Sequence, residues 1–233
     1  ITYNLSQRAK QADMVVIDDP LSIIRCTNKV YLNELLKKEK IPAPQSMLLF
    51  RANKNSFTAI ARQLGTPFIL KIPDGSFSHD MHKINNEKEL NVSLEILFEK
   101  SAILLAQEYI PTDFDWRIGV LEHKPLFACK YFMAKNHWQI YNHEKQGKGK
   151  TGGFETVPIY KVPKNVIKTA LKVTSYIGDG LYGVDLKMID DKVVVIEVND
   201  NPSVDHEVED AILGDELYYR ILNYFSKALE SRF

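Results

Sequence analysis

The chain has 233 residues, 45% hydrophobic and 26% charged, and is long enough to bury a large core in one domain or two lobes. Its 30 basic and 30 acidic side chains cancel, so no overall field draws it to nucleic acid or to a membrane surface, and no apolar run is long enough to span a bilayer. Cys26 and Cys129 lie far apart in apolar surroundings and are expected to be reduced, buried thiols of a cytoplasmic protein. Because the first residue is Ile1, without an initiator Met or a signal peptide, the chain is expected to be part of a longer protein.

Residues 1–44 are predicted to be an N-terminal linker and helix leading into the fold. A short helical stretch lies around residues 5–12, and the apolar run 14–17 predicts a strand. Either Thr27 or Asn28 can cap the next helix, which ends at the prolines of 41–44 because proline cannot continue a helix.

Residues 45–109 are predicted to alternate strands and helices, and one of the strands carries a single charged residue. A strand over 47–50 and a helix over 56–64 lead to a strand over 67–73 whose one charge is Lys71. The polar loop 74–80 and the strand after it suggest a flap whose backbone N–H groups and hydroxyls close over phosphate, although a plain hairpin turn explains it equally well. After a helix over 87–100, the strand 103–110 can offer Glu108 to an adenine edge, or it is a buried strand with one exposed acid.

Residues 110–233 carry two more cations inside predicted strands. Asp115 and Arg117 alternate onto one face of the strand 115–121, with Trp116 on the other, and Lys130 is the lone charge of the strand 126–132. Each cation alone is best explained as a surface lysine or arginine with a buried stem, whereas Lys71, Arg117 and Lys130 together suggest an anion site. A Gly- and Lys-rich loop over 143–153 and helices over 166–177 and 210–232 complete this region.

The segment 181–202 predicts a β-hairpin that carries acids among apolar residues. Asp185 lies in its first strand, while Glu197 and Asn199 lie two apart in the second and therefore share a face. Burying two carboxylates is costly unless a cation lies between them, and oxygen ligands of this kind suit Mg²⁺ or Mn²⁺. The alternative is a solvated strand face in which Lys187 and Lys192 oppose the acids.

In this order the segments resemble the ATP-grasp superfamily, most closely its RimK-type branch of glutamate ligases, from about residue 19 onward. The resemblance is carried by Asn28-Lys29, Lys71, Gln107-Glu108-Tyr109-Ile110, Asp115-Trp116-Arg117, Ala128-Cys129-Lys130, Gly152-Gly153, Asp185 and Glu197-Val198-Asn199 with Pro202. It implies an α+β ATP-grasp fold in which a small lobe over 45–109 and a large lobe over 110–233 have antiparallel sheets enclosing a nucleotide cleft. It also implies a separate N-terminal domain, missing here or supplied by a partner chain.

The resemblance also implies a role for each matching residue. ATP would be held by Lys29, Lys71, Ser76, Ser78, Gln107, Glu108, Tyr109, Ile110 and Asp115. Two Mg²⁺ ions would be held by Asp185, Glu197 and Asn199, and the γ-phosphate and the acylphosphate made from it by Arg117 and Lys130. The acceptor side would be shaped by Asn142, Gly152 and Gly153.

The implied function is an ATP-dependent carboxylate–amine ligase that forms an amide through an acylphosphate. Its substrate would be an amino acid, a peptide or a protein tail. The alternatives are an ATP-grasp kinase and a catalytically silent ATP-binding regulatory module, and the intact Asp185, Glu197 and Asn199 argue against the silent module. Two positions depart from the pattern: the flap has few glycines, and Gly183 stands where some ATP-grasp ligases have a substrate-binding arginine, so D-alanine ligases match less well.

Overall fold

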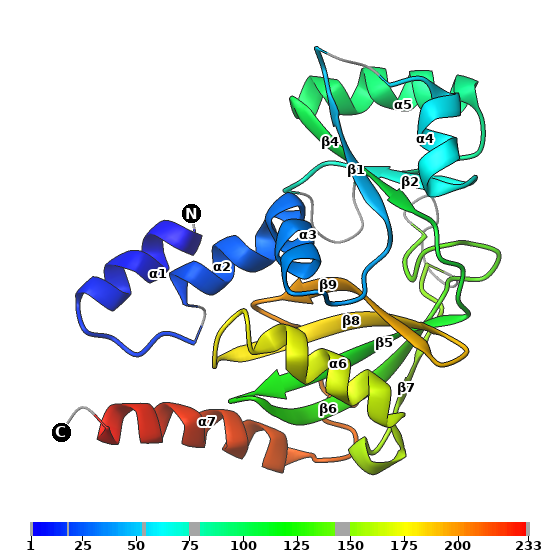
Figure 1. The fold of residues 1–233 in the computed structure, drawn as a ribbon. Helices are drawn as coiled ribbons and strands as arrows, with labels where there is room; N and C mark the ends of the chain where they lie inside the picture. The colour runs from blue at the N-terminus through cyan, green and yellow to red at the C-terminus, as the bar shows by residue number, and fades with distance from the viewer. Residues whose placement is uncertain (1, 18, 53–54, 75–79, 143–149, 232–233) are drawn as a thin grey trace. The chain divides into compact units, whose positions relative to one another are not determined.

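The structure, a computed structural model, describes residues 2–17, 19–52, 55–74, 80–142 and 150–231 (Figure 1). The chain forms two compact units. The larger unit comprises Ile1–Cys26 and Thr112–Phe233, and the smaller unit comprises Thr27–Pro111. Residues 1–44, expected to lead into the fold as one segment, are divided between the two units. The predicted flap residues Ser76 and Ser78 and most of the predicted loop 143–153 lie outside the described residues.

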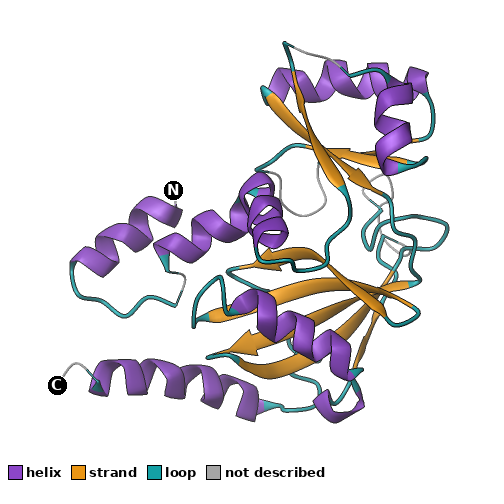
Figure 2. Cartoon of the chain, viewed as in Figure 1, coloured by secondary structure: helices purple, strands orange, loops and turns teal. Residues whose placement is uncertain are grey.

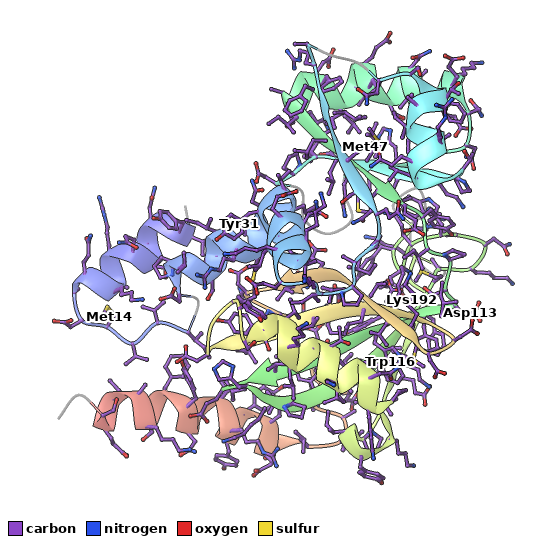
Figure 3. All side chains as sticks on the ribbon, in the orientation of Figure 1. Met14, Tyr31, Met47, Asp113, Trp116 and Lys192 are labelled. Carbon is purple, nitrogen blue, oxygen red and sulfur yellow. The ribbon has the colours of Figure 1, made fainter. Side chains whose placement is uncertain are left out.

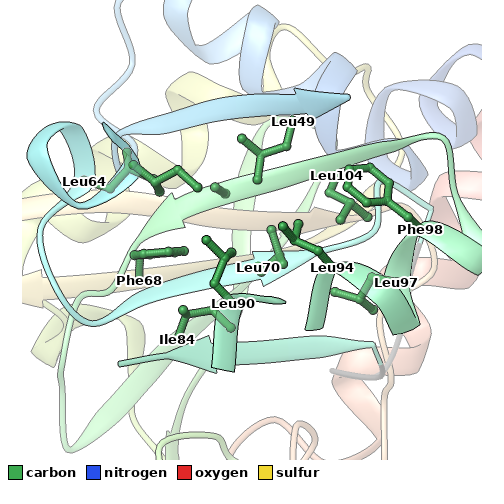
Figure 4. Close-up of a cluster of buried hydrophobic side chains, with 12 residues drawn as sticks. Leu49, Leu64, Phe68, Leu70, Ile84, Leu90, Leu94, Leu97, Phe98 and Leu104 are labelled. Atoms are coloured by element: carbon green, nitrogen blue, oxygen red, sulfur yellow. The ribbon is translucent and has the colours of Figure 1, made fainter. Parts of the chain in front are cut away.

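The smaller unit packs two helices onto a four-stranded antiparallel sheet with the strand order β1-β4-β2-β3. Its strands are β1 (Ser46–Phe50), β2 (Phe68–Lys71), β3 (Met81–Ile84) and β4 (Ile103–Glu108), and its helices are α3 (Lys29–Lys38), α4 (Phe57–Leu64) and α5 (Glu87–Lys100). Alternate strand residues such as Leu49, Phe68, Leu70 and Leu104 are buried against Leu64 of α4 and Leu90, Leu94 and Leu97 of α5 (Figure 4). The period of two leaves Lys71 and Gln107 on the other face of the sheet.

Side-chain caps begin two helices of this unit, and one of the two caps was predicted. Of the two candidates, Asn28 caps α3, because its side-chain oxygen accepts the N–H groups of Val30 at 3.1 Å and Tyr31 at 3.0 Å. Ser56 caps α4 in the same way, and Gly65 ends that helix with φ of 81°, a backbone conformation that favours glycine.

The larger unit has a five-stranded antiparallel sheet with the strand order β7-β6-β5-β8-β9 (Figure 2). Its strands are β5 (Phe114–Leu121), β6 (Lys124–Phe132), β7 (Phe154–Thr156), β8 (Leu181–Ile189) and β9 (Lys192–Asn199). Its helices are α1 (Thr2–Gln11), α2 (Pro20–Thr27), the short 3₁₀ helix η1 (Ile159–Lys161), α6 (Lys164–Thr174) and α7 (Asp215–Glu230). Helix α6 packs against β5, β8 and β9, whose apolar face includes the buried residues Trp116 (labelled in Figure 3), Ile118, Val184 and Leu186. The polar residues of the same strands therefore lie on the opposite face.

Two predicted elements of the larger unit are wrong in detail. The apolar run 14–17 is not a strand, because the Met14 N–H bonds to the Ala9 carbonyl at 3.0 Å and closes the end of α1, with Asp13 at φ of 57°. The last helix begins at Asp215 instead of residue 210, because residues 205–214 form turns that end at Gly214 with φ of 53°. Cys26 and Cys129 are both buried and free, as predicted. Among the described helices, none combines the length and apolar character that crossing a bilayer requires.

Candidate functional site

Arg117, predicted to be catalytic, and the three predicted metal-binding residues share one face of the larger unit's sheet. Arg117 on β5 is paired with Asp185 on β8, and Asp185 is paired with Glu197 on β9. Directly opposite residues of antiparallel strands project to the same face, so these three side chains form a row across three strands. Asn199 is opposite Gly183 and belongs to the same face. The predicted co-facial position of Glu197 and Asn199 is confirmed.

Arg117 and Asp185 form a two-pronged ion pair. The Arg117 Nε lies 2.7 Å from the Asp185 Oδ1, and the Nη2 lies 2.8 Å from the Oδ2. The Asn199 Nδ2 donates to the same Oδ2 at 3.2 Å. Burial disfavours the charged guanidinium, but the adjacent Asp185 carboxylate outweighs burial and raises the pKa of Arg117. The guanidinium is therefore a fixed positive charge on this face.

A second buried ion pair lies beside the first. The Lys187 Nζ lies 2.5 Å from the Asp115 Oδ1 and 2.7 Å from the Thr112 hydroxyl, and the Lys187 and Asp115 side chains are each 13% exposed. Burial raises the pKa of Asp115, and Lys187 opposes that shift. Lys187 was not predicted as a site residue, although its position two residues after Asp185 places it on the same strand face. Asp115, predicted to bind ATP, is thus already paired with Lys187.

Tyr131 on β6 covers the other side of Arg117. The Arg117 guanidinium carbon lies 5.1 Å from the centre of the Tyr131 ring, within the range of a cation–π contact. The Tyr131 hydroxyl donates to Glu209, whose side chain is almost fully buried. Burial and this hydrogen bond raise the pKa of Tyr131, so the phenol stays neutral. Neither Tyr131 nor Glu209 was predicted from the sequence.

The structure does not bring Lys130 beside Arg117. Lys130 is paired with Trp116, so it leaves the sheet on the face opposite to Arg117. Its Nζ lies 2.9 Å from the Glu155 Oε2 and 5.5 Å from the centre of the Trp116 ring. The structure therefore separates the two cations, Arg117 and Lys130, that were predicted to bind the γ-phosphate together.

Three predicted substrate residues lie near the end of β6. Asn142 is buried, and its N–H donates to the Lys150 carbonyl at 2.7 Å. A Cβ on Gly152 would lie 2.1 Å from the Phe132 carbonyl oxygen, and Gly153 has φ of 89°. The backbone path thus requires glycine at both positions. Their role in binding the acceptor stays a prediction.

Gly183, the position that departs from the family pattern, also has a packing reason. A Cβ at Gly183 would lie 2.7 Å from the Pro202 side chain. The proline that follows the predicted metal-binding strand thus fills the space that a larger residue at 183 would need.

In the smaller unit, the two lysines predicted to bind ATP come from segments that contact each other. The backbone N–H of Lys29 donates to the Pro73 carbonyl at 3.0 Å, and the Asn28 side chain donates to Asp74 at 2.9 Å. This contact ties the start of α3 to the segment that follows Lys71. Lys29 is 8% exposed and Lys71 is 4% exposed, unusual burial for lysine.

The predicted ATP-binding residues 107–110 adjoin this pair. The Lys71 Nζ donates to the Gln107 Oε1 at 2.8 Å. The Glu108 carboxylate accepts the Gln45 N–H at 3.0 Å, so part of its hydrogen-bonding capacity is used within the protein. Tyr109 lies under the Lys83 ammonium, 4.1 Å from the ring centre, and Ile110 follows in irregular backbone. The predicted adenine-binding contacts remain predictions.

The donor set on the larger unit fits a hard divalent cation. The described part of the chain has no group of three or more His, Cys, Asp or Glu side chains suited to a metal. The predicted set is of a different kind, because it has two carboxylates and one amide. The Asp185 oxygens accept three hydrogen bonds, whereas a carboxylate offers about four lone pairs. Glu197 and Asn199 contribute further oxygens on the same face. Oxygen ligands of this type suit Mg²⁺ or Mn²⁺.

Comparison with known proteins identifies the family. A model of the RimK-like ATP-grasp domain matches residues 26–224. The chain belongs to the RimK-like ATP-grasp family. Alpha-aminoadipate–LysW ligase LysX of Saccharolobus solfataricus is 26% identical to it, over 85% of this chain and 70% of the relative. A probable alpha-L-glutamate ligase of Vibrio atlanticus is 24% identical, over 88% of this chain and 66% of the relative.

Solved structures share the fold of this RimK-like chain. D-alanine–D-alanine ligase from Bacillus anthracis, complexed with ATP, matches with a TM-score of 0.75 at 18% identity, over 98% of this chain and 76% of that one. VanG D-Ala:D-Ser ligase from Enterococcus faecalis matches with a TM-score of 0.76 at 18% identity, over 95% of this chain and 68% of that one. At such identity the likeness concerns the fold alone. The expectations of an α+β ATP-grasp fold, of the RimK-type branch and of the ligase class are confirmed.

Proposed function

We propose that this RimK-like chain uses the row Arg117–Asp185–Glu197 to run the phosphoryl-transfer step of an ATP-dependent carboxylate–amine ligase. The row carries the proposal, because it places a fixed cation beside two carboxylates on a face formed by three strands. The carboxylates can hold divalent cations that bind a polyphosphate, and the guanidinium beside them can stabilise the phosphoryl group during its transfer.

The proposed ligase reaction has two steps. A carboxylate oxygen of the substrate attacks the γ-phosphorus of ATP, the bond to the bridging oxygen breaks, and ADP leaves. The amine nitrogen of the second substrate then attacks the acyl carbon, phosphate leaves with its bonding electrons, and the nitrogen loses a proton. Arg117 neutralises charge on the transferred phosphoryl group and on the departing phosphate, and its five N–H donors suit that task. Such transfer depends mainly on positioning and charge neutralisation.

Divalent cations held by Asp185, Glu197 and Asn199 would supply charge neutralisation at the β- and γ-phosphates when bound. The other predicted contacts are assigned to the nucleotide: Lys29, Lys71, Gln107, Glu108, Tyr109 and Ile110 in the smaller unit, and Asp115 in the larger one. Asn142, Gly152 and Gly153 are assigned to the acceptor, and Lys130, which leaves the sheet on the face opposite to Arg117, is not assigned to the γ-phosphate.

The names of the relatives support a proposal for the substrate class. LysX is named for joining alpha-aminoadipate and LysW, and other relatives are named as glutamate ligases. We therefore assign to this chain a carboxylate of an amino acid, a peptide or a protein tail. We also assign it to the cytoplasm, because two buried free thiols suit a reducing compartment.

The test is to trap the acylphosphate. The protein is incubated with ATP, Mg²⁺ and a panel of glutamate, alpha-aminoadipate and glutamate-terminated peptides, with and without hydroxylamine. We expect a hydroxamate from at least one carboxylate, its loss in Glu197→Gln, and its retention in Glu122→Gln, which alters a glutamate in the turn between β5 and β6. A phosphorylated product without phosphate release would indicate a kinase. ATP binding without turnover on any carboxylate would contradict the ligase assignment.

A further inference from the structure

We propose that Glu209 is a positioning residue for Arg117 and acts through Tyr131. This inference rests on the proposed function, because it matters for catalysis only if Arg117 contacts the transferred phosphoryl group. Glu209 and Tyr131 are 78 residues apart in sequence, and Tyr131 and Arg117 lie on neighbouring strands.

Glu209 is a buried carboxylate with two separate tasks. Its side chain is among the most buried in the protein, with 1% of the residue exposed. One carboxylate oxygen, Oε2, accepts the Asp205 N–H at 2.8 Å and holds the local turn. The other, Oε1, accepts the hydroxyl of Tyr131. Burying a carboxylate is costly, and a turn alone needs only a small polar side chain, so the second contact indicates a role beyond the turn.

The Tyr131 ring transmits this contact to Arg117. Its hydroxyl is fixed at Glu209, so the ring cannot swing freely, and its centre lies 5.1 Å from the Arg117 guanidinium carbon. Arg117 is therefore held on one side by the Asp185 carboxylate and on the other by an anchored ring.

The contact with Tyr131 matters because the Asp185 carboxylate does not serve Arg117 alone. Its two oxygens already accept three hydrogen bonds from Arg117 and Asn199, and Asp185 is also the predicted ligand of a divalent cation. A cation on Asp185 would draw on the same oxygens and weaken the fork that orients Arg117. The Tyr131 ring, anchored by Glu209, would still contact the guanidinium, since neither contact uses Asp185.

The neighbouring Asp210 provides a matched control. It is also buried, at 3% exposed, and it holds the same turn by accepting from the Glu207 N–H at 2.6 Å, the Tyr218 hydroxyl at 3.0 Å and the His206 Nδ1 at 3.0 Å. Its contacts run to its own turn and to Tyr218 of α7, not to Tyr131. A purely structural effect of disturbing this turn should therefore appear in Asp210→Asn as well.

The first test measures Arg117 directly and needs no activity. We follow hydrogen exchange of the Arg117 Nε–H by ¹⁵N NMR of arginine side chains. The signal is assigned by its absence in Arg117→Lys. We expect exchange about tenfold faster in Tyr131→Phe and Glu209→Gln, comparable to losing one net hydrogen bond, and unchanged in Asp210→Asn. Unchanged exchange in Tyr131→Phe and Glu209→Gln, or an equal acceleration in Asp210→Asn, overturns the proposal.

The second test is kinetic. We expect Tyr131→Phe and Glu209→Gln each to lower kcat of hydroxamate formation by about tenfold to a hundredfold, with the KM for ATP changed less than about threefold. The double variant should be no slower than the worse single variant, because both changes break one connection. Additive losses, or a matching loss in Asp210→Asn, contradict the proposal. A wild-type protein that forms no hydroxamate refutes the proposed function instead, and NMR then decides the positioning of Arg117.

Discussion

Replacing Lys187 with methionine tests whether the buried Asp115 depends on its partner. The Lys187 Nζ lies 2.5 Å from the Asp115 Oδ1, and both side chains are 13% exposed, so solvent screens the pair weakly. Methionine keeps an unbranched apolar stem and removes the charge. Among the described residues, the variant leaves the buried carboxylate with one hydrogen-bond donor, the Thr112 hydroxyl at 3.1 Å.

The expected cost follows from this burial. Two charges about 4 Å apart at an effective dielectric constant of about 20 attract by roughly 4 kcal/mol, and breaking a buried pair costs roughly 3–5 kcal/mol. We expect Lys187→Met to lower the free energy of unfolding by about 3 kcal/mol at pH 8. Burial already raises the pKa of Asp115 and Lys187 opposes that rise, so the variant raises this folded pKa further above the unfolded value. The deficit is therefore present above the raised pKa and shrinks as pH falls towards 4, where the carboxyl is neutral.

Urea unfolding followed by tryptophan fluorescence at pH 8 and at pH 5 measures both effects. Trp116 and Trp138, the protein's two tryptophans, lie in the same unit as the ion pair. Lys192→Met, which alters an exposed lysine at the start of β9 (labelled in Figure 3), is the control and should change stability by less than about 0.5 kcal/mol. Adding Asp115→Asn to Lys187→Met should recover most of the loss. A Lys187→Met deficit below about 1 kcal/mol, or one equal at the two pH values, refutes the reasoning.

Three further predictions follow from single sites. Gly152→Ala should lower stability by about 1–3 kcal/mol, because its Cβ would meet the Phe132 carbonyl oxygen at 2.1 Å; an unchanged urea midpoint would show that the backbone yields freely. Burial raises the pKa of Cys129 to about 11, so in a Cys26→Ala background iodoacetamide at pH 8 should alkylate it only as fast as the protein opens, and the rate of a free thiol would contradict this. Burial also raises the pKa of Tyr182 to about 12, so its neutral form stabilises the fold below the unfolded pKa of about 10, and this contribution is lost between pH 10 and 12. The free energy of unfolding should therefore fall more steeply between pH 10 and 12 in the wild type than in Tyr182→Phe. Equal falls in the two proteins would be evidence against this contribution.

Local patterns predicted much of the fold. The hairpin of β8 and β9 follows from alternation and a polar turn, and its register places Asp185 opposite Glu197. Asn28, one of the two predicted candidates, caps a helix because its side-chain oxygen accepts a backbone N–H three residues later, a purely local contact. The co-facial position of Glu197 and Asn199 needed only the period of a strand.

Contacts between distant segments could not be predicted in this way. Lys130 lies on the Trp116 face because of the β5–β6 register, which also shifts at Gly119/Val120, and the sequence of either strand alone does not fix that register. The contact between Tyr131 and Glu209 joins a strand to a turn 78 residues later. The apolar run 14–17 failed as a strand because the Met14 N–H already ends α1, a competition that alternation does not reveal.

The most direct test of the ligase assignment is oxygen transfer from the substrate. The carboxylate that gives a hydroxamate is labelled with ¹⁸O and incubated with ATP, Mg²⁺ and its amine acceptor, and the released phosphate is analysed by mass spectrometry. Attack of that carboxylate on the γ-phosphorus predicts one ¹⁸O atom in each phosphate released per amide formed, and no labelled phosphate from Glu197→Gln. Amide formation with unlabelled phosphate would contradict the acylphosphate route and, with it, the role proposed for Arg117, Asp185 and Glu197.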